Sequence, residues 1–156
     1  MNDRKATVES PELEMTITRT LNAPRDLAFS AWTEPEHLER WQNAPRGFTV
    51  TTHEVDFRVG GNYRICMRSP EGTDYWLQGV YREIKKPERL VFTYAWLDAQ
   101  GKPGKETLVT ITFADRGNKT EFTLHQSGFA SAGSRDGHHD GWSSSIGRFV
   151  EYLATL

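Results

Sequence analysis

The final segment of the chain, residues 137–156, constrains the fold more than any other. Its large apolar residues Trp142, Ile146, Phe149 and Leu153 recur at steps of four, three and four, which places them on one stripe of an α-helix. Small residues and poor helix formers accompany the start of this stripe: Gly141, Ser143, Ser144, Ser145 and Gly147. The segment therefore predicts a long C-terminal helix whose apolar face covers a sheet, with free space beside its first turns.

Strand-like alternation fills most of the chain before this helix. The pattern predicts six strands, over residues 48–57, 63–68, 75–84, 90–96, 107–114 and 120–127. Short turns between consecutive strands are typical of an antiparallel meander. One face of each strand is apolar and the other is rich in polar residues, so one side of the sheet faces water. An earlier strand, residues 14–21, is expected to complete the sheet as its seventh member.

Two short helices are predicted between the first strand and the second. The first begins at residues 22–24 and runs to about Trp32. Thr33 and Glu36 fit a capping box at the start of the second helix, residues 35–42. The predicted fold class is therefore α+β: a curved antiparallel seven-stranded sheet wrapped on a long C-terminal helix. A sheet of this curvature needs the helix as a lid, and a cavity is expected between them.

Composition narrows the class of protein. A chain of 156 residues with 37% hydrophobic residues fits one domain with a packed core. A net charge of −2 gives no reason to expect nucleic acid or an anionic membrane as a partner. The single cysteine, Cys66, excludes an internal disulfide, and the polar N-terminus does not resemble a signal peptide. We expect a cytoplasmic protein with a flexible tail at residues 1–12 and a single domain at residues 13–156.

A high aromatic content, 12% with five Trp, suggests an aromatic-lined pocket. We expect the inward-facing residues to form a ligand-binding pocket: Trp41, Phe48, Tyr63, Ile65, Tyr75, Leu77, Tyr81, Tyr94, Trp96, Ile111, Gln126, Trp142, Ile146 and Phe149. As a set they favour a mostly apolar site with a few polar tips. For any single residue, packing in the core is the simpler alternative. No cofactor and no metal ion is expected.

Candidates for catalysis are few. Cys66 is interpreted as a structural cysteine, and the spacing within residues 138–140, His-His-Asp, is not that of a helical zinc pair, so these residues are expected to be solvated. The sequence has no Gly-x-Ser-x-Gly motif for an acyl-transfer serine. An inward general acid or base would have to be Tyr81, Tyr94 or His53. We therefore predict no catalytic residue.

Several motifs resemble the Hsp90-ATPase-activator-homologue (AHSA1-like) family. They are Ala23-Pro24-Arg25, Ala31-Trp32-Thr33-Glu34-Pro35-Glu36-His37-Leu38, Trp41, Val55-Asp56-Phe57-Arg58-Val59-Gly60-Gly61, Gly79, Pro87-Glu88-Arg89-Leu90, Ser127-Gly128-Phe129, His139-Asp140-Gly141-Trp142 and Tyr152-Leu153. The resemblance covers residues 13–154. It implies the helix-grip fold of the START, polyketide-cyclase and Bet v 1 superfamily, whose members mostly bind apolar or aromatic molecules between sheet and helix.

The chain departs from the family pattern in two places. Residues 42–45, Gln-Asn-Ala-Pro, stand where the family has a second Trp and then Gly-Pro. Gln126 stands where the family often has a His, and His125 points to the opposite face of the strand.

Three functions remain open. We favour binding of a small apolar or aromatic ligand by a monomer or homodimer. A polyketide-cyclase-like or hydrolase-like enzyme using the same cavity and an Hsp90 interaction module are the alternatives. The Hsp90 alternative has the weaker support, because such a domain usually works beside a second one.

Overall fold

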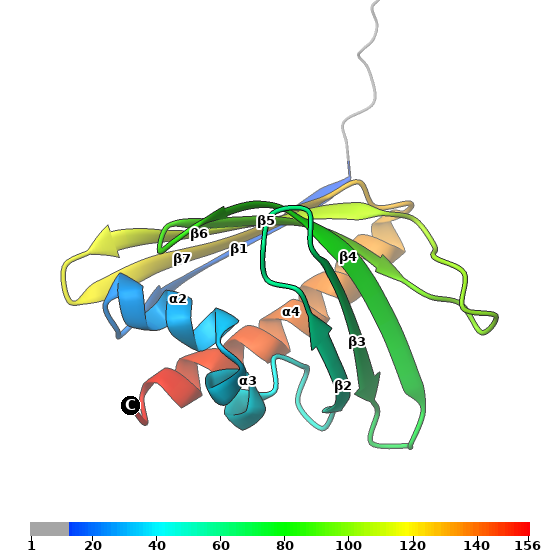
Figure 1. The fold of residues 1–156 in the computed structure, drawn as a ribbon, viewed down its shortest axis with the longest axis horizontal. Coiled ribbons are helices and arrows are strands. Elements are labelled where there is room, and N and C mark those ends of the chain that lie inside the picture. Colours follow the sequence, from blue (N-terminus) through cyan, green and yellow to red (C-terminus); the bar gives the residue numbers. More distant parts are fainter. Residues whose placement is uncertain (1–12) are drawn as a thin grey trace, which may run out of the picture.

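Seven antiparallel strands curve around a long C-terminal helix in the computed structural model, which describes residues 13–156 (Figure 1). The elements are β1 (Glu14–Leu21), α2 (Arg25–Thr33), α3 (Pro35–Trp41), β2 (Thr49–Val55), β3 (Asn62–Arg68), β4 (Asp74–Lys85), β5 (Arg89–Trp96), β6 (Thr107–Arg116), β7 (Lys119–Ser127) and α4 (Ala132–Leu153). This arrangement confirms the predicted helix-grip fold. The N-terminal tail expected at residues 1–12 lies outside the described residues.

The strands form one sheet in the order β1-β7-β6-β5-β4-β3-β2. Strand β1, which was expected to complete the sheet, does so by pairing with β7, and each of the other neighbours in the sheet is also a neighbour in sequence. The pairing register shifts between Tyr81 and Glu83 in β4 and between Val50 and Thr52 in β2. Such irregularities increase local twist and bend. The sheet accordingly curls, so that β2 and β3 descend beside the helices (Figure 1).

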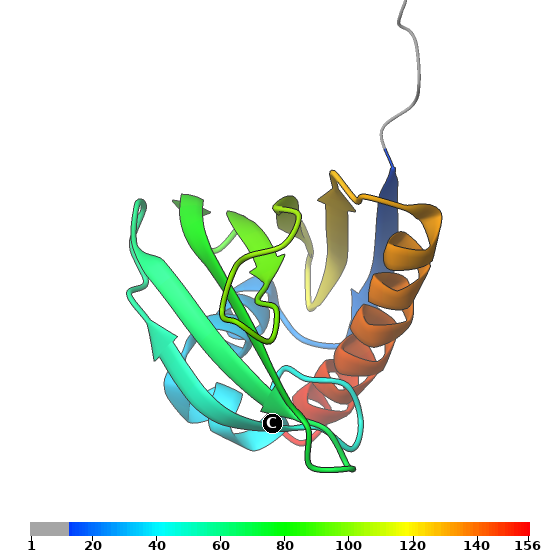
Figure 2. The same cartoon turned by 90° about the vertical axis from the view of Figure 1, so that its right-hand side faces the viewer.

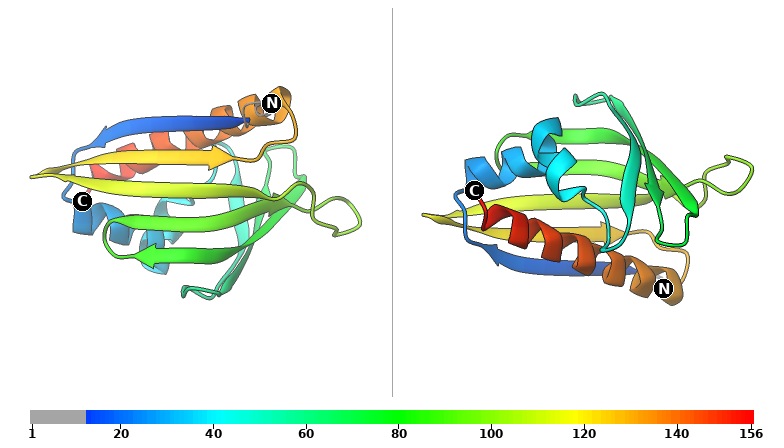
Figure 3. Two further views of the ribbon diagram at one scale, coloured as in Figure 1. Left: turned by 90° about the horizontal axis from the view of Figure 1, so that it is seen from above. Right: turned by 90° about the horizontal axis from the view of Figure 1, so that it is seen from below.

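Helix α4 covers only part of the concave face of the sheet. Seen from below, it runs along β1 and β7 (Figure 3). Figure 2 shows α4 beside β1 on one side of the molecule and β2 and β3 on the other. The described helices include none with the length and apolar character that crossing a membrane requires.

An aromatic cluster fixes the C-terminal half of α4. The ring of Phe149 lies 4.7 Å from that of Trp41, 5.1 Å from that of Trp32 and 5.8 Å from that of Phe122, measured between ring centroids. Phe149 is fully buried. Because these rings come from α2, α3, β7 and α4, the cluster joins both short helices and the sheet to the long helix.

Two local expectations were wrong. Helix α4 begins at Ala132 rather than at residue 137, because the hydroxyl of Ser131 caps it by accepting a hydrogen bond from the Ser134 amide at 3.0 Å. Thr33 does not cap α3; its hydroxyl donates to the Phe29 carbonyl of the preceding helix at 2.8 Å. The Pro35 ring at the first turn of α3 fits that position without a side-chain cap.

Replacing Phe149 by Ala should lower the free energy of unfolding by about 3–5 kcal/mol, because a fully buried ring leaves a cavity among three others. Urea denaturation followed by circular dichroism measures this change. Val150→Ala is the matched control on the same helix, since Val150 is exposed, and should alter stability by no more than about 0.5 kcal/mol. A cost for Phe149→Ala as small as that of the control would contradict the placement of Phe149.

Candidate functional site

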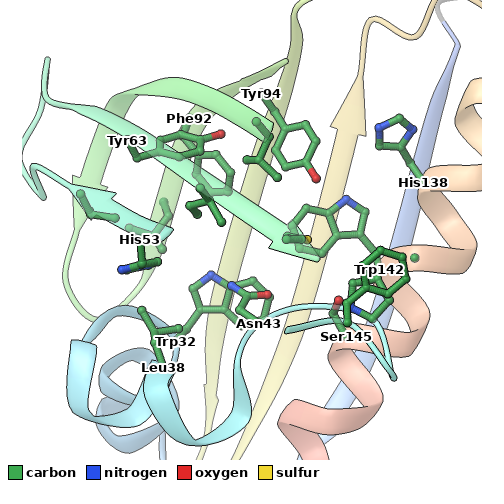
Figure 4. Close-up of a pocket in the computed structure, with 18 of the residues that line it drawn as sticks. Trp32, Leu38, Asn43, His53, Tyr63, Phe92, Tyr94, His138, Trp142 and Ser145 are labelled. Carbon is green, nitrogen blue, oxygen red and sulfur yellow. The ribbon is translucent and has the colours of Figure 1, made fainter. Parts of the chain in front are cut away.

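A pocket of about 1010 Å³ lies on the concave face of the sheet where α4 does not cover it (Figure 4). Strands β2 to β5 form one wall, the first half of α4 forms the opposite wall, and α2, α3 and the α3–β2 loop close one end. The walls are mainly apolar and aromatic, and the pocket opens to solvent. Its volume lies at the upper end of the range usual for small-molecule sites, which is roughly 300–1,000 Å³.

The structure divides the residues expected at the pocket into two groups. Those on the walls are Phe48, Tyr63, Ile65, Tyr75, Leu77, Tyr81, Tyr94, Trp96 and Trp142. Those outside the walls are Trp41, Ile111, Gln126, Ile146 and Phe149, which are buried in the core. For this second group the expected position on the pocket surface was wrong, because α4 and the short helices pack directly on the sheet there and bury the side chains of both layers between them.

Gln126 belongs to a buried chain of hydrogen bonds behind the pocket. Its Oε1 atom accepts from Trp142 Nε1 at 2.8 Å, and its Nε2 atom donates to the Thr107 hydroxyl at 2.8 Å. The Thr107 hydroxyl donates in turn to the Tyr94 carbonyl at 2.9 Å. The side chains of Gln126 and Thr107 are both buried. The chain therefore joins α4 to β7, β6 and β5 and fixes the indole of Trp142, which is itself part of the wall.

His138 was expected to be solvated but lies on the pocket wall, half-buried. Its Nε2 atom accepts from Trp96 Nε1 at 2.9 Å, and its Nδ1 atom lies 2.7 Å from the Ser134 carbonyl oxygen. A carbonyl accepts only, so Nδ1 carries the proton and the ring is the neutral tautomer. The neighbours His139 and Asp140 are exposed, and residues 13–156 contain no cluster suited to a metal ion.

Burial moves the pKa of four groups on the pocket wall, three phenols and one imidazole, in the direction that favours the neutral form. Burial raises the pKa of the Tyr81 and Tyr94 phenols, so both remain protonated. Burial likewise raises the pKa of Tyr63, whose hydroxyl donates to the Thr93 carbonyl at 2.6 Å. His53 has a large accessible area, yet the surrounding walls desolvate its ring and lower its pKa. Protonated phenols and a neutral imidazole offer hydrogen bonds rather than charge.

Charged side chains lie at the edge of the pocket. Lys86 and Asp140 are exposed, and Glu34 is half-buried at the end of α2. Cys66, expected to be structural, is 1% exposed and does not line the pocket. Among the described residues, the interior thus presents apolar surface and neutral polar atoms, and it places no ionised group where a ligand would be enclosed.

The α3–β2 loop contains residues 42–45, which depart from the family pattern. Hydrogen bonds hold this loop against α4. Arg148 donates from Nη1 to the carbonyls of Ala44 at 3.0 Å and Pro45 at 3.2 Å. The amide of Arg46 donates to the Ser144 hydroxyl at 2.8 Å. These bonds fix a wall of the pocket, to which the loop contributes Asn43, Pro45 and Phe48.

Several wall residues were not predicted. Phe92 lies on the same face of β5 as Tyr94 and Trp96, so strand alternation alone was a sufficient signal for it. Trp32 and Asn43 had no such signal, because the first lies near the end of a short helix and the second lies in an irregular loop. Their positions depend on how α2 and α3 pack against α4.

A family model described as "Activator of Hsp90 ATPase homolog 1-like protein" matches residues 22–154. Similar solved structures include an AHSA1 protein from Silicibacter pomeroyi, with a TM-score of 0.84, 24% sequence identity, and coverage of 92% of this chain and 99% of that one. A protein from Chromobacterium violaceum has a TM-score of 0.81 and 26% identity over 90% of this chain and 96% of its own. A protein from Arthrobacter aurescens has a TM-score of 0.78 and 26% identity over 92% and 87%. No curated protein matches the sequence.

Gln126→Leu should lower the free energy of unfolding by about 1–3 kcal/mol, because it leaves the Trp142 indole N–H without its acceptor. Trp142→Phe removes that donor, so Gln126→Leu should cost less in the Trp142→Phe background than alone. Chemical denaturation of the four proteins of this cycle measures the coupling. If the losses in free energy of unfolding of the two single variants simply add in the double variant, the bond between Trp142 and Gln126 does not contribute to stability.

Gly137→Ala should raise the free energy of unfolding by about 1 kcal/mol, because Ala forms helices better and a Cβ at this position meets no atom within 4 Å. Gly147→Ala is the control within the same helix. Its Cβ would lie 3.2 Å from Arg46 Nη2, so the gain should be smaller. Thermal denaturation compares the two variants. A loss of stability in Gly137→Ala would contradict the placement of residue 137 in a helix with open space beside it.

Proposed function

The chain belongs to the family of Activator of Hsp90 ATPase homolog 1-like proteins, and we propose that it binds a small, uncharged, mainly apolar or aromatic molecule in the pocket beneath α4. The family has a fold suited to ligand binding. The observation that carries the proposal is the pocket itself, which combines aromatic walls, neutral polar tips and enough volume for a molecule of several rings.

Aromatic side chains support a planar ligand. The ring of Tyr94 lies 5.7 Å from that of Trp142 and 5.8 Å from that of Trp96, and the ring of Tyr63 lies 5.8 Å from that of Phe92. Figure 4 shows Tyr63 and Phe92 on one side of the pocket and Trp142 on the other, so aromatic rings border it on two sides. Aromatic groups bind well in such surroundings through burial of apolar area and through edge-to-face contacts.

Charge supports a neutral ligand. Enclosing a carboxylate without a cationic partner is costly, and the charged side chains of the site lie at its edge. The phenols of Tyr81 and Tyr94 stay protonated because burial raises their pKa, so at neutral pH they favour hydrogen bonding over proton abstraction. The pocket is therefore better suited to binding than to acid–base catalysis by these two residues.

The neutral fluorophore N-phenyl-1-naphthylamine should bind with a saturable rise in fluorescence, because its rings leave water for an apolar pocket. Ile65→Trp adds bulk to the pocket wall on β3 and should weaken binding at least tenfold. Fluorescence titration measures both, and thermal denaturation should show that the variant remains folded.

Arg64→Trp is the matched control, because Arg64 is the neighbouring residue of β3 and is exposed on the opposite face of the sheet. Its affinity for the fluorophore should equal that of the unaltered chain. Equal weakening by both variants, or no saturable binding to the unaltered chain, would contradict the proposal.

A further inference from the structure

Two polar atoms at the closed end of the pocket have no partner among residues 13–156. The Oδ1 atom of Asn43 is buried and accepts no hydrogen bond. Trp32 is 5% exposed and lines the pocket, and its indole N–H, which the protein does not fully enclose, donates to none of the described residues. By contrast, the indoles of Trp41, Trp96 and Trp142 all donate, to Ala31, His138 and Gln126 respectively. A buried acceptor normally has a partner, and an indole N–H that faces a pocket can donate to a molecule inside it, so these two atoms point to a ligand.

A third residue with a polar group, Ser145, lines the same pocket. The Trp32 ring stacks on that of Trp142 at 6.2 Å between centroids, and Ser145 follows Trp142 by one helical turn. The carbonyl of the residue after Asn43 is bonded to Arg148, a further turn along α4. We call Trp32, Asn43 and Ser145 the polar corner. Figure 4 shows all three on the helical side of the pocket, opposite Tyr63 and Phe92.

The chemistry of the polar corner distinguishes between ligand groups. The indole N–H of Trp32 only donates, whereas Oδ1 of Asn43 only accepts. A hydroxyl group satisfies both, because its oxygen accepts and its proton is donated. An ether or ketone oxygen satisfies the indole alone. A carboxylate carries a charge for which the corner, built from an indole, an amide and a hydroxyl, has no cation.

We propose that the ligand carries an uncharged hydroxyl group, of an alcohol or a phenol, and that this group lies in the polar corner between Trp32 and Asn43. The proposal rests on the proposed function, because it assigns the orientation and chemical class of a ligand in the same pocket. The apolar body of the ligand then lies towards the aromatic side chains of β3 and β5.

A series of naphthalene derivatives tests the proposal by displacement of N-phenyl-1-naphthylamine. 2-Naphthol should bind about tenfold more tightly than naphthalene, because its hydroxyl satisfies two polar atoms and each hydrogen bond is worth about threefold. 2-Methoxynaphthalene, which accepts but does not donate, should fall between the two. 2-Naphthoate, which is anionic at neutral pH, should bind most weakly.

Two variants remove the atoms of the polar corner singly. Trp32→Phe keeps an aromatic ring but loses the N–H, and Asn43→Gly suits a backbone with a φ of 43° in the left-handed region. Each should reduce the preference for 2-naphthol over naphthalene severalfold and leave the affinity for naphthalene almost unchanged. In Asn43→Gly, 2-naphthol should bind no better than 2-methoxynaphthalene.

Matched controls lie outside the pocket. Trp76→Phe alters an indole on the outer face of β4, beneath the Arg64 guanidinium, and Asn118→Gly alters the exposed turn between β6 and β7. Both should keep the full preference for 2-naphthol. Competitor titrations that displace the fluorophore, corrected for the absorbance of each competitor, compare the unaltered chain with the four variants. Thermal denaturation in parallel shows whether each variant remains folded.

The outcomes separate this proposal from the one on which it rests. Equal affinity for naphthalene, 2-methoxynaphthalene and 2-naphthol would overturn the polar corner while leaving apolar binding in place. An unchanged preference for 2-naphthol in both Trp32→Phe and Asn43→Gly would do the same. Failure of every compound, and of the fluorophore, to bind the unaltered chain would overturn the proposed function and this inference with it.

Discussion

The packing of Phe149 against rings from α2, α3 and β7 is the interaction on which the rest of the structure depends. It fixes the C-terminal half of α4 over one side of a sheet that is too curved for a straight helix to cover completely. A helix is a rigid rod, and the strands diverge from it towards β2. The space that remains between rod and sheet is the pocket, so the cavity follows from the same geometry that forms the core.

Hydrogen bonds accompany aromatic packing in the first half of α4. The Trp142 indole donates a hydrogen bond to Gln126 of β7, and the Trp96 indole of β5 donates one to His138 of α4. Indole donors thus connect the first half of the helix to these two strands. Directional bonds of this kind hold a helix at a set distance, whereas apolar contacts draw surfaces together. In this region the indoles of Trp96 and Trp142 therefore line the pocket and also bond α4 to the sheet.

The strand pattern and the final apolar stripe were enough to predict the sheet, its meander order and the covering helix, because alternation and helical spacing are local properties. The start of α4 was not predictable in the same way, because its first turns are rich in Gly and Ser and depend on the Ser131 cap. Alternation also could not separate Tyr94 from Ile111, which share the concave face; only the crossing of α4 decides which is covered. Trp32 and Asn43 depend on helix packing and on a loop, which leave no periodic signal.

The division of α4 into a packed half and a lining half has a consequence for how such proteins diverge. Substitutions at Ile65 or Tyr75 change the shape and polarity of the pocket without touching the ring cluster around Phe149. Trp32 belongs both to the ring cluster and to the pocket wall, whereas Ile65 and Tyr75 belong to the wall alone, so part of the ligand choice is separate from the folding free energy. A lineage with this architecture can exchange one small molecule for another by few mutations, each of which leaves the scaffold folded.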